Sequence, residues 1–429
     1  MINMNKRKNI ILKGDIIYAD LDRQIKYYPD SYLVCENGKT AGVFQTLPAL
    51  YQQFPVRDCS SQLIVPGMSD LHVHAPQYSF RGLGMDLELL EWLNTHTFPE
   101  EAKYADISYA RKAYEIFVSD LRQSTTTRAC IFATIHNEAT LILMDLLEQS
   151  GLHTFVGRVN MDRNGGENLC EENADISYKQ TKEWILASQK NYSHTKPILT
   201  PRFIPSCTDK LMKHLSVLQK EFKLPVQSHL SENLSEIAWV KELVPSSSCY
   251  GNAYENFEMF GGEVPTIMAH CVYSSDEEIR LMKERNVFIA HCPESNINLA
   301  SGIAPVRNYL DLDLHIGLGS DIAGGASLSL LRAMAYAIQS SKLYYRLIDQ
   351  KKKPLSFEDV FYLATLGGGQ FFGKIGTFLP DYEFDAVVLD DSDIHSIRTL
   401  TLKERMERLI YETEKVKVIG KYVNGTMLF

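Results

Sequence analysis

The stretch PGMSDLHVHAPQYSFRG, residues 66–82, places two histidines two positions apart behind a Pro-Gly turn. Successive side chains of a β-strand point to opposite faces, so Leu71 and Val73 are expected on one face and His72 and His74 on the other. Two imidazoles on one face can hold a metal ion. Two inert, hydrogen-bonded histidines at a strand end would give the same pattern, so the rest of the chain must decide.

Seven further apolar or β-branched runs follow, separated by longer amphipathic segments. The eight runs cover residues 62–74, 125–135, 153–162, 197–206, 224–231, 265–273, 286–295 and 314–322. Between them, residues 138–151 have apolar residues at helical spacing and end in glycine, and Ser275 is a candidate N-cap for a helix over 275–286. Eight strands that alternate with helices predict an α/β fold, namely a (β/α)8 TIM-type barrel over residues 66–375.

The two ends of the chain have a different pattern. Residues 8–60 indicate short strands with turns, including an Asn37-Gly38 hairpin signal, and residues 376–429 are again strand-like. We therefore expect a small β-sandwich domain built from residues 1–65 and 376–429. The loop at 163–175, rich in Gly, Asn and Glu, is a candidate lid over the barrel mouth or a plain solvated loop.

Composition excludes several classes of partner. The 429 residues carry a net charge of −9 without a block of lysines and arginines, which argues against nucleic acid. No apolar stretch approaches membrane-spanning length, and the basic start lacks the apolar region of a signal peptide. The eight cysteines are scattered without a CxxC pair, which favours free thiols in the cytoplasm.

Further metal-binding residue types stand at the ends of later runs. His229, His270 and Asp321 end the fifth, sixth and eighth runs, as His72 and His74 end the first. Barrel enzymes assemble their active sites at the C-terminal ends of the strands, so these side chains should converge. Three imidazoles and a carboxylate make a suitable metal site, with zinc as the usual ion. This convergence favours the metal interpretation of the two opening histidines.

At this point the chain resembles the amidohydrolase superfamily. The resemblance rests on PGMSDLHVH, on the single His229 and His270, on HCPESN at 291–296 and on GSD at 319–321. The pieces HAPQYSF, TPRFIPSC, QSHLSEN and NINLASG narrow it to the guanine deaminases of the metal-dependent deaminase branch. The resemblance implies hydrolytic deamination of guanine, a small purine base, to xanthine and ammonia by a homodimeric enzyme.

The resemblance also implies roles for individual residues. The implied ligands of one zinc ion, with iron as a possible substitute, are His72, His74, His229 and Asp321. The implied catalytic residues are Glu232, which would shuttle protons, His270 and Asp321. The implied substrate-binding residues are Gln77, Arg202, Phe203, His229, Glu232 and Asp321. Some relatives carry a carboxylated lysine on strand four, and its absence from 197–206 points to a single metal.

Structural interpretations stay open beside these roles. Glu232 could be an acid at a helix N-terminus, Phe203 a core residue, and Arg202 the partner of a rim carboxylate. His291 is expected to be a hydrogen-bonded core histidine. The alternative activities are deamination of another aminopurine, a pterin or a triazine, and a non-catalytic barrel scaffold is the remote alternative. The cytidine-deaminase type of zinc enzyme is excluded because its HxE and PCxxC motifs are absent.

Overall fold

The computed structural model describes residues 9–429, so the basic start of the chain at residues 1–8 lies outside the described residues. Two groups of parallel strands form the centre. The first sheet has the order β5 (Met68–His74), β6 (Thr126–Phe132), β7 (His153–Gly157) and β9 (Thr195–Pro197). The second has the order β11 (Val226–Leu230), β12 (Thr266–His270), β13 (Phe288–His291) and β14 (His315–Leu318). The α/β class is therefore confirmed.

The two sheets approach each other on both sides. On one side β14 lies against β5, and on the other a bridge joins Leu199 to Val226. A short pair, β8 (Val159–Asn160) with β10 (Thr200–Pro201), extends the third and fourth predicted runs. Each of the eight predicted runs thus contains a strand, although the runs at 153–162 and 197–206 are each broken into two short pieces.

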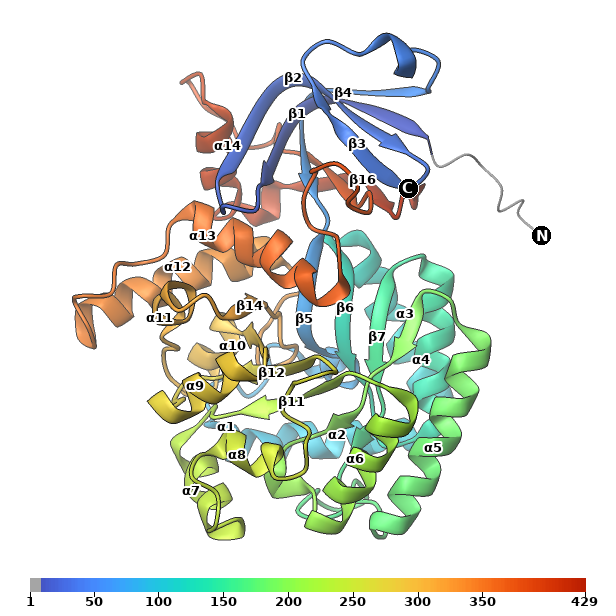
Figure 1. Cartoon of the computed structure of the whole chain (residues 1–429), viewed down its shortest axis with the longest axis vertical. Coiled ribbons are helices and arrows are strands. Elements are labelled where there is room, and N and C mark those ends of the chain that lie inside the picture. The colour runs from blue at the N-terminus through green and yellow to red at the C-terminus, as the bar shows by residue number, and fades with distance from the viewer. Residues whose placement is uncertain (1–8) are drawn as a thin grey trace.

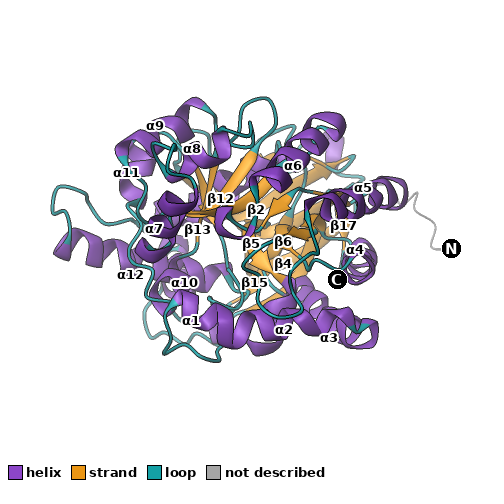
Figure 2. Cartoon of the chain, turned by 90° about the horizontal axis from the view of Figure 1, so that it is seen from below, coloured by secondary structure: helices purple, strands orange, loops and turns teal. Residues whose placement is uncertain are grey.

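Helices surround these strands, as the view in Figure 2 shows. They are α1 (Leu89–Trp92), α2 (Phe98–Ala102), α3 (Ile107–Gln123), α4 (Asn137–Ser150), α5 (Ala174–Asn191), α6 (Asp209–Phe222), α7 (Leu234–Leu243), α8 (Tyr250–Glu255), α9 (Asp276–Glu284), α10 (Pro293–Asn298), α11 (Val306–Asp311), α12 (Leu330–Leu347), α13 (Phe357–Tyr362) and α14 (Leu402–Leu409). The expected ends are present: Gly151 closes α4 at φ 79°, and the Ser275 side chain accepts from Glu278 N–H at the start of α9. Within residues 9–429, each helix is too short or too polar to cross a bilayer.

The chain ends share one mixed sheet of seven strands (Figure 1). Its order is β17 (Thr426–Met427), β16 (Lys417–Val423), β15 (Ala386–Asp390), β4 (Val56–Pro66), β1 (Ile10–Ala19), β2 (Ile25–Glu36) and β3 (Lys39–Phe44). The hairpin between β2 and β3 turns at Asn37 and Gly38, both at positive φ, as the Asn-Gly signal predicted. Since β15 pairs with β4, the two ends of the chain do assemble together. The two-layer sandwich and the domain boundaries stay predictions.

A buried ion pair links the terminal sheet to the central strands. Arg128 of β6 donates from Nε and Nη2 to the carboxylate of Asp385 at 2.7 and 3.0 Å. Arg128→Met should lower the free energy of unfolding by about 3–5 kcal/mol, because it leaves a buried carboxylate without its cation. Urea unfolding measures this loss. Lys182→Met, at an exposed pair with Glu221, is the control and should cost less than about 1 kcal/mol. Equal losses in the two variants would contradict the prediction.

Candidate active site

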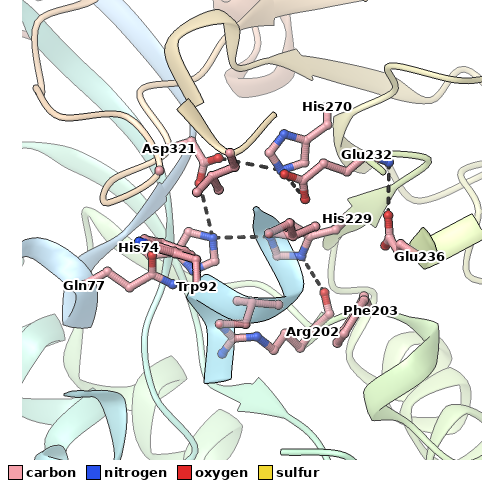
Figure 3. Close-up of a pocket in the computed structure, with 14 residues that line it drawn as sticks. His74, Gln77, Trp92, Arg202, Phe203, His229, Glu232, Glu236, His270 and Asp321 are labelled. Atoms are coloured by element: carbon pink, nitrogen blue, oxygen red, sulfur yellow. Dashed lines mark hydrogen bonds and ion pairs between the residues drawn. The ribbon is translucent and has the colours of Figure 1, made fainter. Parts of the chain in front are cut away.

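The strand-end residues converge as predicted. His72 and His74 project from one face of β5, and their Nε2 atoms lie 3.1 Å apart. His229, at the end of β11, places its Nε2 atom 3.3 Å from that of His74. Asp321 follows β14, and its Oδ1 atom lies 3.2 Å from His72 Nε2 and 3.5 Å from His74 Nε2. Figure 3 shows Asp321, His74 and His229 pointing toward one another.

The spacing of these atoms suits a metal ion that they would share. Ligand atoms bound to one zinc ion at about 2.0–2.1 Å lie within about 4.2 Å of one another, and the four separations given above are 3.1–3.5 Å. Burial lowers the pKa of His72, and lowers those of His74 and His229 far more. Burial opposes ionisation of Asp321, but His72 and His270 outweigh it and hold its pKa well below the usual value. Neutral imidazoles beside a carboxylate are in the state that binds metal.

Neighbouring groups fix the orientation of these side chains. The Nδ1 atom of His229 donates to the backbone carbonyl of Arg202 at 2.6 Å, which leaves its Nε2 lone pair facing the cluster. The carboxylate of Asp70 accepts from Ser320 N–H, from Ser320 Oγ and from His72 N–H. Asp70 therefore ties β5 to the segment that carries Asp321. The position of Asp70, two residues before His72, is evident from the sequence. Its bond to Ser320, 250 residues later, is not.

The fourth strand differs from the prediction in one respect. The strand begins at Thr195, before the predicted run, and therefore includes Lys196. The Lys196 side chain is exposed, whereas the histidines of the cluster are buried. A lysine on this strand is thus present but faces away from the cluster, so it offers no bridging ligand.

Glu232 and His270 lie on the open side of the cluster. His270 Nε2 is 3.4 Å from Glu232 Oε2 and 3.7 Å from Asp321 Oδ2, and its Nδ1 atom donates to Asn296 Oδ1 at 2.9 Å. Ser301 Oγ donates to Glu232 Oε1 at 3.0 Å. Burial raises the pKa of Glu232. Burial disfavours the charged form of His270, but Glu232 and Asp321 outweigh it and raise its pKa. The group can thus hold and exchange a proton.

Glu232 stands at the N-terminal end of α7 but does not cap the helix. The N-cap of α7 is Asn233, whose side chain accepts from Ser235 N–H, and Glu236 closes the capping box. Glu232 precedes the helix and points to His270 instead (Figure 3). Its carboxylate is therefore free for chemistry in the cavity.

A cavity opens onto these groups. Eight predicted residues line it, namely His74, Gln77, Arg202, Phe203, His229, Glu232, His270 and Asp321. Sequence reasoning missed the others, namely Leu89, Trp92, Leu93, Glu236, Leu299 and Gly324. None of the lining residues comes from the loop at 163–175, whereas Leu89 and Trp92 of α1 and Leu93 of the π-helical turn at Leu93–Thr97 do line the cavity.

Arg202 combines the two roles weighed for it. Its guanidinium forms a buried bidentate pair with Glu101 of α2, and it also lines the cavity. Phe203 likewise is both buried and part of the cavity wall. Gln77 donates to Glu101 and accepts from Ala323 N–H. The sequence did not identify Glu101 as the partner of Arg202.

The expectation for His291 is partly wrong. The side chain is buried at the end of β13, as expected of a core residue. Neither ring nitrogen, however, has a hydrogen-bond partner among the described residues. Burial lowers its pKa to about 3, so the ring is neutral.

Comparison with known proteins places this site in a family. The sequence profile described as the amidohydrolase family matches residues 63–428. A guanine deaminase of Dictyostelium discoideum is 37% identical, covering 97% of this chain and 94% of the relative. The human guanine deaminase is 42% identical over 77% of this chain and 73% of its own.

Solved structures agree with the sequence comparison. A crystal structure of guanine deaminase from C. acetobutylicum, with guanine bound in its active site, superposes with a TM-score of 0.95. It is 46% identical and covers 98% of this chain and 100% of its own. The E. coli guanine deaminase is 30% identical, with a TM-score of 0.87 over 98% of this chain and 99% of its own. The chain belongs to the amidohydrolase family, in which its relatives are guanine deaminases.

Proposed function

We propose that this protein is an enzyme that deaminates guanine to xanthine and ammonia by hydrolysis. The observation that carries the proposal is that Glu232 and His270 lie beside the ligand cluster in the wall of one cavity, which also includes Arg202 and Gln77. The relative from C. acetobutylicum with guanine bound supports the choice of substrate. Xanthine formation from guanine, followed by ultraviolet absorbance beside an ammonia assay, tests it.

The ligand set supports one zinc ion, with iron as a possible substitute, held by His72, His74, His229 and Asp321. Zinc lowers the pKa of a water molecule that it binds to about 7, which supplies hydroxide at neutral pH. Asp321 would contribute one oxygen as a ligand, and its second oxygen lies 3.7 Å from His270 Nε2. Of the four residues, His74, His229 and Asp321 line the cavity.

Glu232 moves the protons that the reaction requires. Deamination forms a carbon–oxygen bond at carbon two of guanine and breaks the carbon–nitrogen bond to its amino group. Glu232 takes a proton from the attacking water and gives it to the neighbouring ring nitrogen, and the second water proton leaves with ammonia. His270 lies beside Glu232 and Asp321 and orients the water between them. General acid–base transfer of this kind contributes about 10²–10⁴ to the rate.

The cavity wall holds the purine. Arg202 and Gln77 offer N–H groups to the carbonyl edge of guanine, and Phe203 offers a ring face for stacking. Leu89 and Trp92 of α1, with Leu93 of the π-helical turn that follows, cover the apolar faces of the base. His229, Glu232 and Asp321 face the end of the base that reacts.

The proposal includes the finer architecture. The contacts of β14 with β5 and the bridge from Leu199 to Val226 support closure of the central strands into a (β/α)8 barrel over residues 66–375. Residues 1–65 and 376–429 would form the small β-sandwich domain. A homodimer in the cytoplasm is proposed from the family resemblance alone, and light scattering tests the dimer.

Two other functions need a test. Deamination of another aminopurine, a pterin or a triazine would use the same metal cluster, so ammonia release from a panel of these compounds separates them. A non-catalytic scaffold would be expected to lose ligand residues, whereas here the cluster is complete and buried.

One tightly bound metal ion per chain is the expected composition of the purified protein. Elemental analysis measures it, and zinc should predominate. His72→Ala should lose the metal, because it removes one of the four proposed ligand atoms. His395→Ala, at an exposed histidine, is the control and should retain it. Two ions per active chain would contradict the single-metal proposal.

A further inference from the structure

A buried charge pair stands at the edge of the cavity, away from the reacting groups. Glu101 of α2 is 1% exposed and Arg202 is 3% exposed. Arg202 Nη1 donates to Glu101 Oε2 at 2.6 Å, and Nη2 donates to Oε1 at 3.1 Å. Gln77 Nε2 donates to the same Oε1 at 2.8 Å. One carboxylate thus receives N–H groups from both residues proposed to hold the substrate.

The network determines which way the Gln77 amide points. Ala323 N–H can only donate, so the amide atom that faces it at 2.9 Å must be the Gln77 oxygen. The amide nitrogen then faces Glu101, as its 2.8 Å bond requires. Gln77 is held at both ends, and one N–H of its amide stays unused by these bonds.

The same network fixes the Arg202 guanidinium. A guanidinium carries five N–H groups, of which two point at Glu101. The ring of Phe98 lies 5.1 Å from Arg202 Cζ. Phe98 and Glu101 are three residues apart on α2 and so share one helix face. One short helix therefore supplies both a charge partner and a ring for the guanidinium.

The charge of Glu101 is hidden from the substrate. Arg202 and Gln77 line the cavity, whereas Glu101 is not among the lining residues. The Glu101 carboxylate neutralises the positive charge of Arg202 without itself lining the cavity. The wall at this edge consequently offers N–H donors, which suit a ligand edge made only of acceptors, such as a ring carbonyl beside an unprotonated ring nitrogen.

We infer that Glu101 is a positioning residue that sets the preference for a 6-oxopurine. It acts through Arg202 and Gln77, by holding their donors toward the carbonyl edge of the base. The inference rests on the proposed function and extends it to a residue outside the cavity wall. Its consequence is specific: loss of Glu101 should harm substrates that carry the carbonyl and largely spare those that lack it.

Guanine and 2-aminopurine make the test, because both carry the amino group at carbon two and only guanine carries the 6-carbonyl. Glu101→Gln keeps the size of the side chain but removes its charge and turns an N–H group toward the arginine. The kcat/KM for guanine should fall about 10²-fold, the loss that a small misplacement of a binding group can cause. The value for 2-aminopurine should fall less than about threefold, so the ratio of the two drops more than tenfold. Metal content should stay at the value of the unmodified protein.

Two further variants complete the experiment. Glu91→Gln, at an exposed acid of α1, is the matched control and should leave both values unchanged. If Glu101→Gln is poorly folded because Arg202 loses its partner, the double variant Glu101→Gln/Arg202→Met removes both charges. Compared with Arg202→Met alone, the double variant should lower the ratio of guanine to 2-aminopurine by less than Glu101→Gln does in the unmodified protein, because Glu101 can then act only through its bond to Gln77.

The outcomes separate the two proposals. No ammonia from guanine with the unmodified, metal-loaded protein contradicts the proposed function. Guanine turnover in that protein, with both substrates impaired equally by Glu101→Gln, means that Glu101 only supports the fold and overturns the inference. A loss on guanine in the double variant, relative to Arg202→Met, that is as large as the loss caused by Glu101→Gln alone overturns it as well, since Glu101 would then act independently of Arg202.

Discussion

Glu232→Gln is expected to lower kcat for guanine by about 10²–10⁴-fold, because the amide cannot take a proton from water and pass it to the ring. Glu232 touches His270 and Ser301 rather than a helix terminus, so the exchange should leave the fold intact. Stopped-flow or steady-state kinetics give kcat, and metal analysis with thermal unfolding shows whether the site survives. Glu242→Gln, on the exposed side of α7, is the control. Near-normal turnover of Glu232→Gln would assign the proton transfer to another group.

The pH dependence of kcat is a second test of the role of Glu232. Glu232 must be ionised to accept a proton, so kcat should rise with pH as this group loses its own proton. Burial raises its pKa, which places the rise above the pH range of an exposed glutamate, about 4.3. In Glu232→Gln this acid limb should disappear from the residual activity. An unchanged limb would mean that a different group controls it.

Local patterns in the sequence predicted the strands and the convergence of the candidate ligands. The period of two in β5 put His72 and His74 on one face, and the rule that parallel strands end together brought His229 and Asp321 to them. Such predictions succeed because each residue is placed by the strand that carries it. The path of the chain after β11 is harder to predict from the sequence, because Glu232 lies beyond the end of that strand. Glu232 nevertheless lines the cavity.

Contacts between distant segments could not be predicted in this way. Glu101 and Arg202 form an ion pair although they are 101 residues apart in the sequence. Asn296 of α10 accepts a hydrogen bond from His270, which ends β12. Nothing in the spacing around Glu101 distinguishes it from Glu100, which bonds Lys103 instead. The predicted lid at 163–175 does not line the cavity, because Arg163 is bonded to the carbonyls of Ile204 and Pro205 and the segment packs beside them.

Selectivity between purines depends on the same distant contacts. Guanine carries a carbonyl acceptor at position six and an amino group at carbon two, whereas adenine carries an amino donor at position six. If Arg202 and Gln77 hold the carbonyl, carbon two faces the ligand cluster and Glu232. Adenine in the same pose would direct a donor at an arginine that can only donate, and it would offer no amino group to the cluster.

The unmodified enzyme should therefore prefer guanine to adenine by at least about 10⁴–10⁵ in kcat/KM, since buried donors left unpaired reject the wrong base. Arg202→Met should remove most of the guanine activity and keep the metal. The bond that orients His229 goes to the backbone carbonyl of residue 202, which the substitution does not remove. Phe203 can stack on either base, so it increases affinity without contributing to selectivity between guanine and adenine. Xanthine formation and ammonia release from adenine are measured side by side. Similar rates on the two bases, or unchanged guanine kinetics in Arg202→Met, would show that the donors of this wall do not read the carbonyl edge, and the orientation of the base in the cavity would have to be reversed.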